Sequence, residues 1–207
     1  MDVMSESPAI SESPAYQQLP AGRYRIDVEQ STVSFTTRHF FGLGPVRGTI
    51  ALRDGMITVG DPVAGSTVRA RVAASTFRSG SQPRDAAVLS PRLLDAENYP
   101  SLTFTSTDLV RESAAGPAGN PGQWRLRGEL EVRGVTRLVE VRIIALSVAE
   151  DGPAGPAGPT LRASAQLSVD RYAFGITAYR GLAARMLTID LDLRAQSVDQ
   201  RERTGRR

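Results

Sequence analysis

Apolar and polar positions alternate along most of the chain from residue 23 onward. In the clearest stretch, 124–132, Trp124, Leu126 and Leu130 alternate with charged Arg and Glu side chains. A strand with one buried face produces this period of two, whereas a helix would scatter the apolar positions around its axis. The same alternation recurs over 139–145, 161–169 and 187–193. These segments predict antiparallel strands that each bury one face.

Five earlier segments are also predicted to be strands: 32–38, 46–52, 56–59, 66–73 and 102–110. Asp54 and Gly55 predict a tight hairpin turn between the second and third of them. A helical pattern occurs over 85–97, where Pro91 limits the helix to one or two short turns. Two connections, 113–122 and 149–159, contain the string Ala-Gly-Pro-Ala-Gly and are expected to be mobile loops.

About eight or nine antiparallel strands in sequence predict an all-β protein, closed as a barrel or stacked as a sandwich. A barrel of about eight strands holds either its own side chains or one small ligand. Four small residues on the predicted inner face favour a hollow centre, and bulky neighbours that fill the space are the alternative: Ala70, Gly128, Ala163 and Ala165. An up-and-down meander would bring three connections to one end of the barrel: 74–101, 133–136 and 170–185.

Composition and charge narrow the classes of function. The 25 basic residues are all Arg and are interspersed with 22 acidic residues, so the clustered positive face that binds nucleic acid is not expected. The chain has no Cys, which excludes disulfides, thiolate nucleophiles and cysteine metal sites. No apolar run is long enough for a membrane-spanning helix. We therefore expect no nucleic-acid partner and no integral membrane association.

The two ends differ from the strand-rich region. Residues 1–20 are acidic, rich in Ser and Pro and without the apolar stretch of a signal peptide, so they predict a disordered arm. Residues 199–207 form a basic tail. One barrel domain is expected over 21–198, and the cytoplasm is the expected compartment. The pattern is compatible with a monomer or a homodimer.

Four groups of short strings occur in a characteristic order: 24–27 with 31–39 and 46–48, then 84–85 with 90–95 and 99–106, then 128–136, then 170–176. In these strings the chain resembles the YceI-like family of lipocalin-like barrels, which is associated with polyisoprenoid binding. The resemblance covers roughly residues 23–196. The chain departs from the family pattern where the usual His is Ala87, the usual Leu is Val88, the usual Phe pair is Leu93-Leu94 and the usual basic-Pro pair is Arg137-Leu138.

The resemblance implies an antiparallel lipocalin-like β-barrel of about eight strands with one short helical segment. It also implies a non-catalytic carrier of a long-chain apolar ligand, a polyisoprenoid or an isoprenoid quinone, without a cofactor. An uncharged wall suits such a ligand because a sugar or nucleotide would lose its hydration there without compensation. Each buried CH₂ contributes roughly 0.8 kcal/mol, so three or four isoprene units would offset the ~4–15 kcal/mol cost of association.

The predicted site has an apolar wall and a polar rim. The wall comprises Phe35, Phe40, Phe41, Leu89, Leu93, Leu94, Phe104, Leu126, Leu130, Val141, Leu167, Phe174, Ile176 and Leu191. The rim, which would meet a head group, comprises His39, Arg84, Asp85 and Arg171. Arg84-Asp85 and Asp170-Arg171 are each also expected to form an ion pair that pins a long connection against the barrel, and this structural role is the stronger expectation.

Two other classes of function remain open. His39 is the only histidine, and a barrel isomerase or hydrolase would use it or Asp85 as its ionisable group. As a metal ligand the single histidine would stand almost alone in a chain without Cys, so no metal site is predicted. The other alternative is a barrel with a filled core whose tails recruit partners, which predicts no interior cavity and no extractable ligand.

Overall fold

The computed structural model describes residues 19–39, 44–111, 124–149 and 158–198, with the backbone alone described at Arg38, His39 and Gly44. Residues 1–18 of the predicted 1–20 arm, the basic tail and most of the two Ala-Gly-Pro loops lie outside these residues. The described chain forms ten strands: β1 (Gly22–Ile26), β2 (Thr32–His39), β3 (Gly44–Ile50), β4 (Leu52–Val59), β5 (Thr67–Ala73), β6 (Ser101–Arg111), β7 (Trp124–Val132), β8 (Val135–Ala149), β9 (Thr160–Asp170) and β10 (Met186–Ser197).

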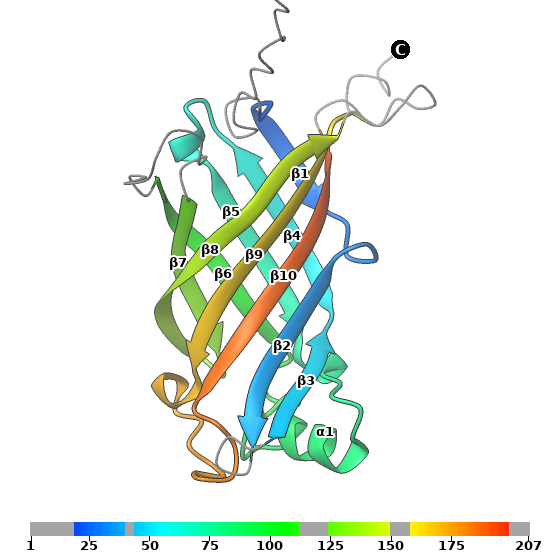
Figure 1. Ribbon diagram of the computed structural model, residues 1–207, viewed down its shortest axis with the longest axis vertical. Coiled ribbons are helices and arrows are strands. Elements are labelled where there is room, and N and C mark those ends of the chain that lie inside the picture. Colours follow the sequence, from blue (N-terminus) through cyan, green and yellow to red (C-terminus); the bar gives the residue numbers. More distant parts are fainter. Residues whose placement is uncertain (1–18, 40–43, 112–123, 150–157, 199–207) are drawn as a thin grey trace, which may run out of the picture.

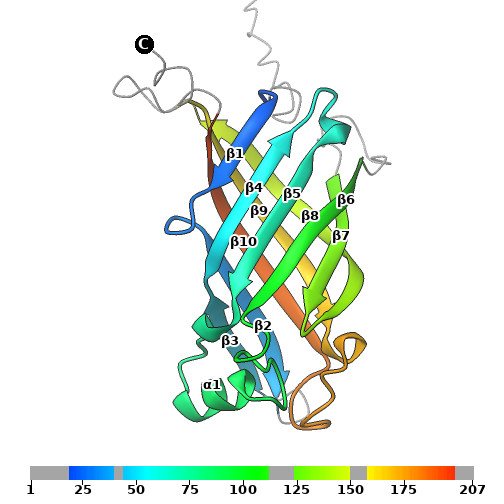
Figure 2. The same ribbon diagram turned by 180° about the vertical axis from the view of Figure 1, so that it is seen from behind.

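The ten strands close into an antiparallel barrel with eight positions (Figures 1 and 2), which confirms the predicted fold class. β1 pairs with the C-terminal part of β10, and β2 pairs with its N-terminal part, so β1 and β2 share one position. β3 and β4 share the next position, since β3 pairs with β2 and β4 pairs with β1. From β4 onward each strand pairs with its successor, and β10 closes the ring.

Two predicted details of the strands are wrong because of bulges. Asp54 and Gly55 lie inside β4, next to a register shift against β5, and do not form a hairpin turn. The chain instead breaks at Ala51, between β3 and β4, where the Ala51 N–H donates to Thr76 Oγ1 at 2.8 Å. In β8 a shift between Ile143 and Ala145 changes the face, so Ala145 is exposed. A bulge reverses the side-chain alternation that follows it, which the period-two pattern alone does not reveal.

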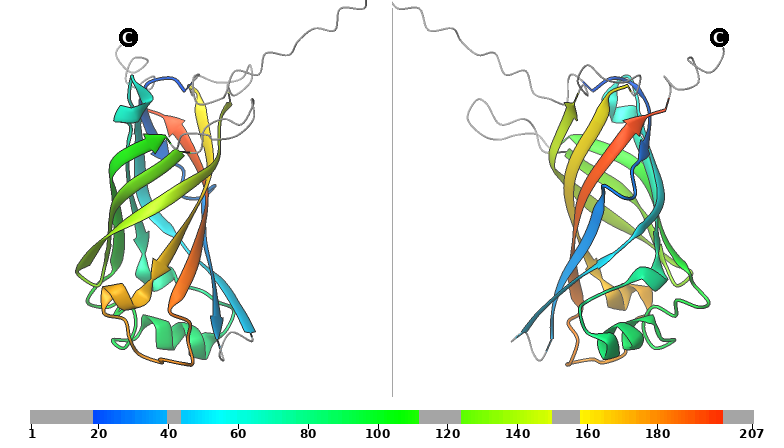
Figure 3. Two further views of the ribbon diagram at one scale, coloured as in Figure 1. Left: turned by 60° about the vertical axis from the view of Figure 1, so that its left-hand side comes forward. Right: turned by 90° about the vertical axis from the view of Figure 1, so that its right-hand side faces the viewer.

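One end of the barrel, called the α1 end below, carries the short helix and three connections. The helix α1 spans Gln82–Leu89, with Pro83 in its first turn, and ends before Pro91. It therefore begins earlier than the predicted 85–97 segment, because Pro is tolerated at a helix start and not in its interior. The connections 74–100, 133–134 and 171–185 meet at this end, as the meander predicts (Figures 1 and 3).

The 74–100 connection is fixed to the barrel by apolar packing and by a short strand contact. The rings of Phe35 in β2 and Phe77 stack with centroids 4.6 Å apart, and Val88 and Leu94 pack against the same cluster. Thr49 and Arg78 exchange backbone hydrogen bonds of 2.8 and 2.9 Å, which joins this connection to β3. One edge of β3 pairs with β2. The connection covers the other edge, which pairs with no strand of the described chain.

The crossing of this connection over β3 requires a residue without a side chain at Gly48. A Cβ at this position would meet the Arg78 carbonyl oxygen and the Phe35 ring. We expect Gly48→Ala to lower the free energy of unfolding by about 1–3 kcal/mol, since the backbone of the connection must shift. Urea unfolding measures this loss. Gly65→Ala is the control, because a Cβ added at Gly65 would have no neighbouring atom within 4 Å. Equal effects of the two substitutions would contradict this packing.

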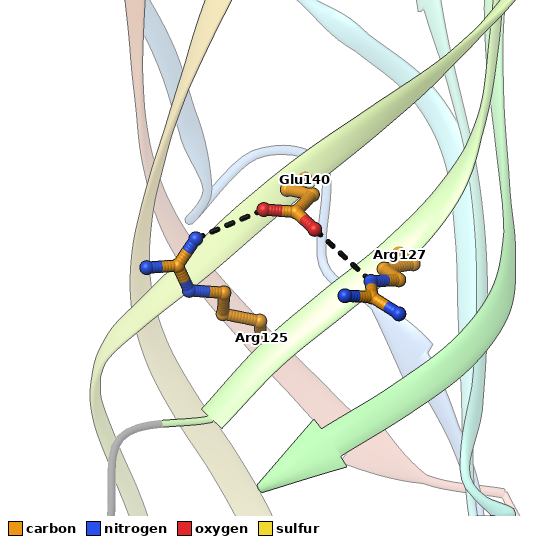
Figure 4. Close-up of polar contacts among 3 residues, drawn as sticks. All are labelled: Arg125, Arg127 and Glu140. Atoms are coloured by element: carbon orange, nitrogen blue, oxygen red, sulfur yellow. Dashed lines mark hydrogen bonds and ion pairs between the residues drawn. The ribbon is translucent and has the colours of Figure 1, made fainter. Parts of the chain in front are cut away.

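The outer surface of the barrel carries the charged half of the alternating pattern. On β7 and β8, Glu140 accepts hydrogen bonds from Arg125 at 2.9 Å and from Arg127 at 3.0 Å (Figure 4). These hydrogen bonds hold the pKa of Glu140 below its ordinary value. The charges of this stretch therefore face solvent, and the apolar residues of the same strands face the interior.

Candidate functional site

A cavity of about 660 Å³ runs inside the barrel. All strands from β2 to β10 contribute side chains to it, and nearly all of these are aliphatic or aromatic. The polar or amphipathic side chains of its wall are Thr37, Ser66, Arg84, Trp124, Arg171 and Tyr179. No Asp, Glu or His side chain within the described ranges lines the cavity. The interior can hold an apolar molecule, and the described part of its wall has no carboxylate that could act as a general base.

Small inward residues explain part of the hollow. Ala70, Ala163 and Ala165 line the cavity, as the sequence suggests. Gly128 does not line it: a Cβ at Gly128 would lie 2.5 Å from the Phe104 ring, so that ring already fills the space beside it. At Gly128 a bulky neighbour therefore fills the space, as the alternative predicts. Along β9 the space beside Ala163 and Ala165 remains part of the cavity.

Most of the predicted wall residues meet around the cavity: Phe35, Leu93, Leu94, Phe104, Leu126, Leu130, Val141, Leu167, Phe174, Ile176 and Leu191. Leu89 is placed elsewhere, because it packs behind the wall against the cluster of Phe35, Val46 and Phe77. Phe40 and Phe41 lie outside the described residues. Contact of any of these side chains with a ligand stays a prediction.

Sequence reasoning named Arg171, Phe174 and Ile176 in the 171–185 connection, but it missed the lining residues that follow Ile176 and the start of β10. Tyr179, Leu182 and Leu187 line the cavity at the α1 end. Leu187 continues the alternation of β10 and could have been named from it. Tyr179 and Leu182 lie in an irregular segment without periodicity, where Tyr179 has a positive φ of 56°, so no sequence pattern indicates which way they point.

Arg84 and Asp85 both bind Ser79 and are not paired directly in the described structure, so the predicted ion pair is wrong. Asp85 is buried and accepts hydrogen bonds from the Ser79 N–H at 2.9 Å and from its hydroxyl at 2.5 Å. Arg84 Nε donates to the Ser79 hydroxyl at 2.7 Å, and its terminal nitrogen donates to the Ser79 carbonyl at 3.2 Å. Ser79 therefore lies between the two side chains, and Arg84 also lines the cavity whereas Asp85 does not.

Arg171 is buried and is held by backbone carbonyl groups. Its guanidinium donates to the carbonyl oxygens of Ile176 and Ala178 at 2.7 Å, Ala184 at 2.8 Å and Ala183 at 3.0 Å. Burial lowers the pKa of this guanidinium from its ordinary value. The predicted pairing with Asp170 is therefore wrong, and Arg171 instead folds the 171–185 connection around itself, beside the cavity.

Asp170 pairs with Arg185 across the two ends of the same connection. Arg185 donates two hydrogen bonds to one Asp170 oxygen, at 2.6 and 2.9 Å, and the Tyr172 N–H donates to the other at 2.9 Å. These contacts hold the pKa of Asp170 below its ordinary value, chiefly through Arg185. The ion pair is partly exposed, and it ties the end of β9 to the start of β10.

Acid should weaken the fold through Asp170 and Glu140. Their lowered folded-state pKa values mean that the unfolded chain binds more protons, so this stabilisation is complete above about pH 5 and is lost as the pH falls through the folded values. We expect the double variant Asp170→Asn, Glu140→Gln to show a weaker dependence of the unfolding midpoint on pH between about 3 and 6. Thermal unfolding in a pH series measures it, and an unchanged slope would contradict these pairings.

The side chain of His39 lies outside the described residues, so its predicted rim position stays untested. Within the described ranges no group of three potential ligand residues could hold a metal ion. The helix found there is too short to cross a bilayer.

The YceI-like domain matches residues 24–196, which is most of the chain and includes every strand that encloses the cavity. The chain belongs to the YceI-like family. No curated protein matches it in sequence. Among solved structures, BcnA of Burkholderia cenocepacia is 20% identical with a TM-score of 0.63, covering 82% of this chain and 98% of its own. A polyisoprenoid binding domain from Saccharophagus degradans is 12% identical with a TM-score of 0.57, covering 86% and 99%.

These likenesses show the fold. Four of the six residues in which this member of the family departs from the usual pattern lie in one region, and the other two, Arg137 and Leu138, are exposed on β8. Ala87, Val88, Leu93 and Leu94 all line the cavity at the α1 end. Alanine stands at the position where the family usually has an imidazole, which leaves Arg84 as the nearest polar side chain of α1 on the cavity wall. The chain-specific differences therefore affect the polarity of the end of the cavity.

Proposed function

We propose that this protein binds and carries a long-chain apolar lipid, of isoprenoid type, inside the barrel and catalyses no reaction on it. The observation that supports the proposal is the 660 Å³ cavity with an almost wholly apolar wall. The alternative of a filled barrel predicts no such cavity. The similar structure from Saccharophagus degradans is a polyisoprenoid binding domain, which agrees with this ligand class.

The volume of the cavity bounds the length of the buried chain. An apolar protein cavity of ~150 Å³ binds one benzene molecule, so 660 Å³ corresponds to roughly four benzene-sized groups. This is about 25 carbon atoms, or about five isoprene units. Each buried CH₂-sized group contributes roughly 0.8 kcal/mol, so burial of such a chain contributes more free energy than the ~4–15 kcal/mol that association costs. Shape and length would then select the ligand more than hydrogen bonds do.

The polar end of the ligand would lie at the α1 end. Four of the polar or amphipathic side chains of the wall belong to this end: Thr37, Arg84, Arg171 and Tyr179. Arg171 already donates to four carbonyl oxygens, whereas Arg84 donates two hydrogen bonds to a single serine, Ser79. A planar guanidinium suits a carboxylate, a phosphate or a quinone carbonyl oxygen. Arg84 is therefore the proposed head-group ligand, with Arg171 as the structural cation beneath it.

The chemistry of the wall supports the proposed non-catalytic role. The alternative enzyme would need His39 or Asp85 at the ligand. Asp85 accepts two hydrogen bonds from Ser79 and is not part of the cavity wall. The wall residues of the described chain then include no carboxylate or imidazole to act as a general base.

A length series of isoprenoid carboxylates tests the proposal. Protein freed of lipid by organic extraction and refolding is titrated with ligands of about 10 to 40 carbons. The affinity should rise with each isoprene unit and level off near about 25 carbons, where the cavity is full. An affinity independent of chain length would contradict the proposal, as would tight binding of a sugar or a nucleotide.

The head-group assignment has its own pair of variants. Arg84→Gln should weaken binding of a carboxylate-headed ligand about tenfold or more, since it removes a charge-assisted hydrogen bond, and should leave the matching hydrocarbon unaffected. Arg92→Gln, an exposed arginine of the same connection, is the control. Equal losses for the carboxylate and the hydrocarbon would assign Arg84 a purely structural role.

A further inference from the structure

Exposed apolar side chains gather on the 171–185 connection and the first residue of β10. Tyr179 is 39% exposed, Leu182 is 51% exposed and Met186 is 49% exposed. These three residues are called the apolar tip below. Figures 1 and 3 show their segment, in orange, beside α1 at one end of the barrel. Several large apolar side chains exposed on one short segment are uncommon on a soluble surface and indicate an interaction site.

The apolar tip is continuous with the cavity. Tyr179 and Leu182 line the cavity and are also exposed to solvent, whereas every other lining residue of the described chain is buried or half-buried. Ala183 and Ala184, which follow them, line the cavity as well. An unbroken apolar surface therefore leads from the interior to the outside at the α1 end, and a lipid leaving the cavity here would pass over the tip.

Positive charge surrounds the apolar tip. The connections of this end carry four exposed arginines, Arg78, Arg92, Arg180 and Arg185, and one exposed carboxylate, Glu97. Asp85 and Asp95 are buried and hydrogen-bonded, and half-buried Asp170 pairs with Arg185. At the opposite end, the described 60–66 connection has Asp61 as its charged residue. Among the described connections, exposed positive charge is therefore greater at the end where the cavity opens.

We propose that the α1 end docks on the surface of an anionic lipid bilayer, with the apolar tip in the interface and the arginines on the lipid phosphates. Tyrosine, leucine and methionine suit this depth, where an apolar body and a polar edge are both satisfied. An apolar ligand would then pass between bilayer and cavity without crossing water. The transfer step rests on the proposed function, whereas the docking itself requires only the tip and its charges.

Vesicle flotation tests the docking with the full chain, freed of lipid so that the result is independent of ligand binding. The probes are vesicles of phosphatidylcholine alone and vesicles that contain phosphatidylglycerol. The wild-type protein should float with the anionic vesicles, and less at high salt, because exposed charges are screened. Leu182→Ser should reduce the bound fraction about tenfold, and Arg180→Gln about fivefold.

Matched control variants distinguish vesicle binding through the apolar tip from nonspecific binding through any exposed apolar or basic side chain. Ile144→Ser removes an apolar side chain that is 55% exposed on β8, and Arg162→Gln removes an exposed arginine of β9, so neither should change vesicle binding. The proposal is overturned if Leu182→Ser and Ile144→Ser behave alike. It is also overturned if wild-type protein does not float with anionic vesicles, in which case the tip belongs to a protein partner. A protein that docks and binds no isoprenoid would refute the proposed function alone.

Discussion

Ala165→Trp should abolish binding of a long-chain ligand and leave the barrel folded. Ala165 lies in β9 opposite Ile143 and Leu191, lines the cavity and is 7% exposed. An indole at this position would occupy at least one benzene-sized share of the 660 Å³ and would block the passage of a continuous chain. The ligand would lose contacts of roughly six carbon groups, about 5 kcal/mol, so we expect at least a hundredfold weaker binding.

Titration calorimetry with an isoprenoid carboxylate measures this loss, and circular dichroism with thermal unfolding shows whether the variant folds. Ala145→Trp is the control, because the bulge in β8 turns Ala145 outward and leaves it exposed. The same alanine-to-tryptophan change there should leave binding within a factor of two or so. Undiminished binding by Ala165→Trp would place the ligand outside the barrel.

Arg171→Met should lower the free energy of unfolding by about 3–5 kcal/mol, a large fraction of the stability of a domain this size. The substitution keeps an unbranched apolar stem but removes the donors of four backbone carbonyl oxygens, those of Ile176, Ala178, Ala183 and Ala184. Each acceptor left unpaired costs about 1–3 kcal/mol, less what water recovers where the connection is open to solvent. The 171–185 connection should therefore lose its fixed course.

Urea unfolding gives the magnitude, and amide hydrogen exchange over residues 176–184 gives the location. Arg171→Lys should lose an intermediate amount, since an ammonium has three donors and lacks the planar fork. Arg180→Met, on the exposed part of the same connection, should change stability by less than about 0.5 kcal/mol. If Arg171→Met lowered the free energy of unfolding no more than Arg180→Met does, the hydrogen bonds from Arg171 to the four carbonyl oxygens would not stabilise the fold.

The alternating pattern predicted the strands well where they are regular. β7, β9 and β10 follow the sequence closely because the apolar positions of each strand face the interior of the barrel. The pattern failed at Asp54, Gly55 and Ala145, where a bulge or a broken strand shifts the register. Those irregularities depend on pairing with distant strands, for example of β4 with β1, and such pairing leaves no local mark in the sequence.

Side-chain partners could be predicted less well than the wall of the cavity. Inward positions follow from the period of two, so most of the expected apolar residues do line the interior. The adjacency of Asp170 and Arg171 in sequence suggested a pair, yet Asp170 ends β9 and Arg171 begins a 3-10 turn, so their side chains diverge. The carbonyl cluster around Arg171 comes from an irregular loop, whose course is set by the very contacts that a sequence cannot show.

Native mass spectrometry of the freshly purified full-length protein, followed by organic extraction of what it carries, tests the central claim most directly. The account predicts a bound apolar lipid of several hundred daltons that survives purification and is missing from Ala165→Trp prepared in the same way. The account is contradicted if the wild-type protein has the mass of the bare chain and yields no lipid on extraction. It is also contradicted if Ala165→Trp retains the bound lipid to the same extent as the wild type.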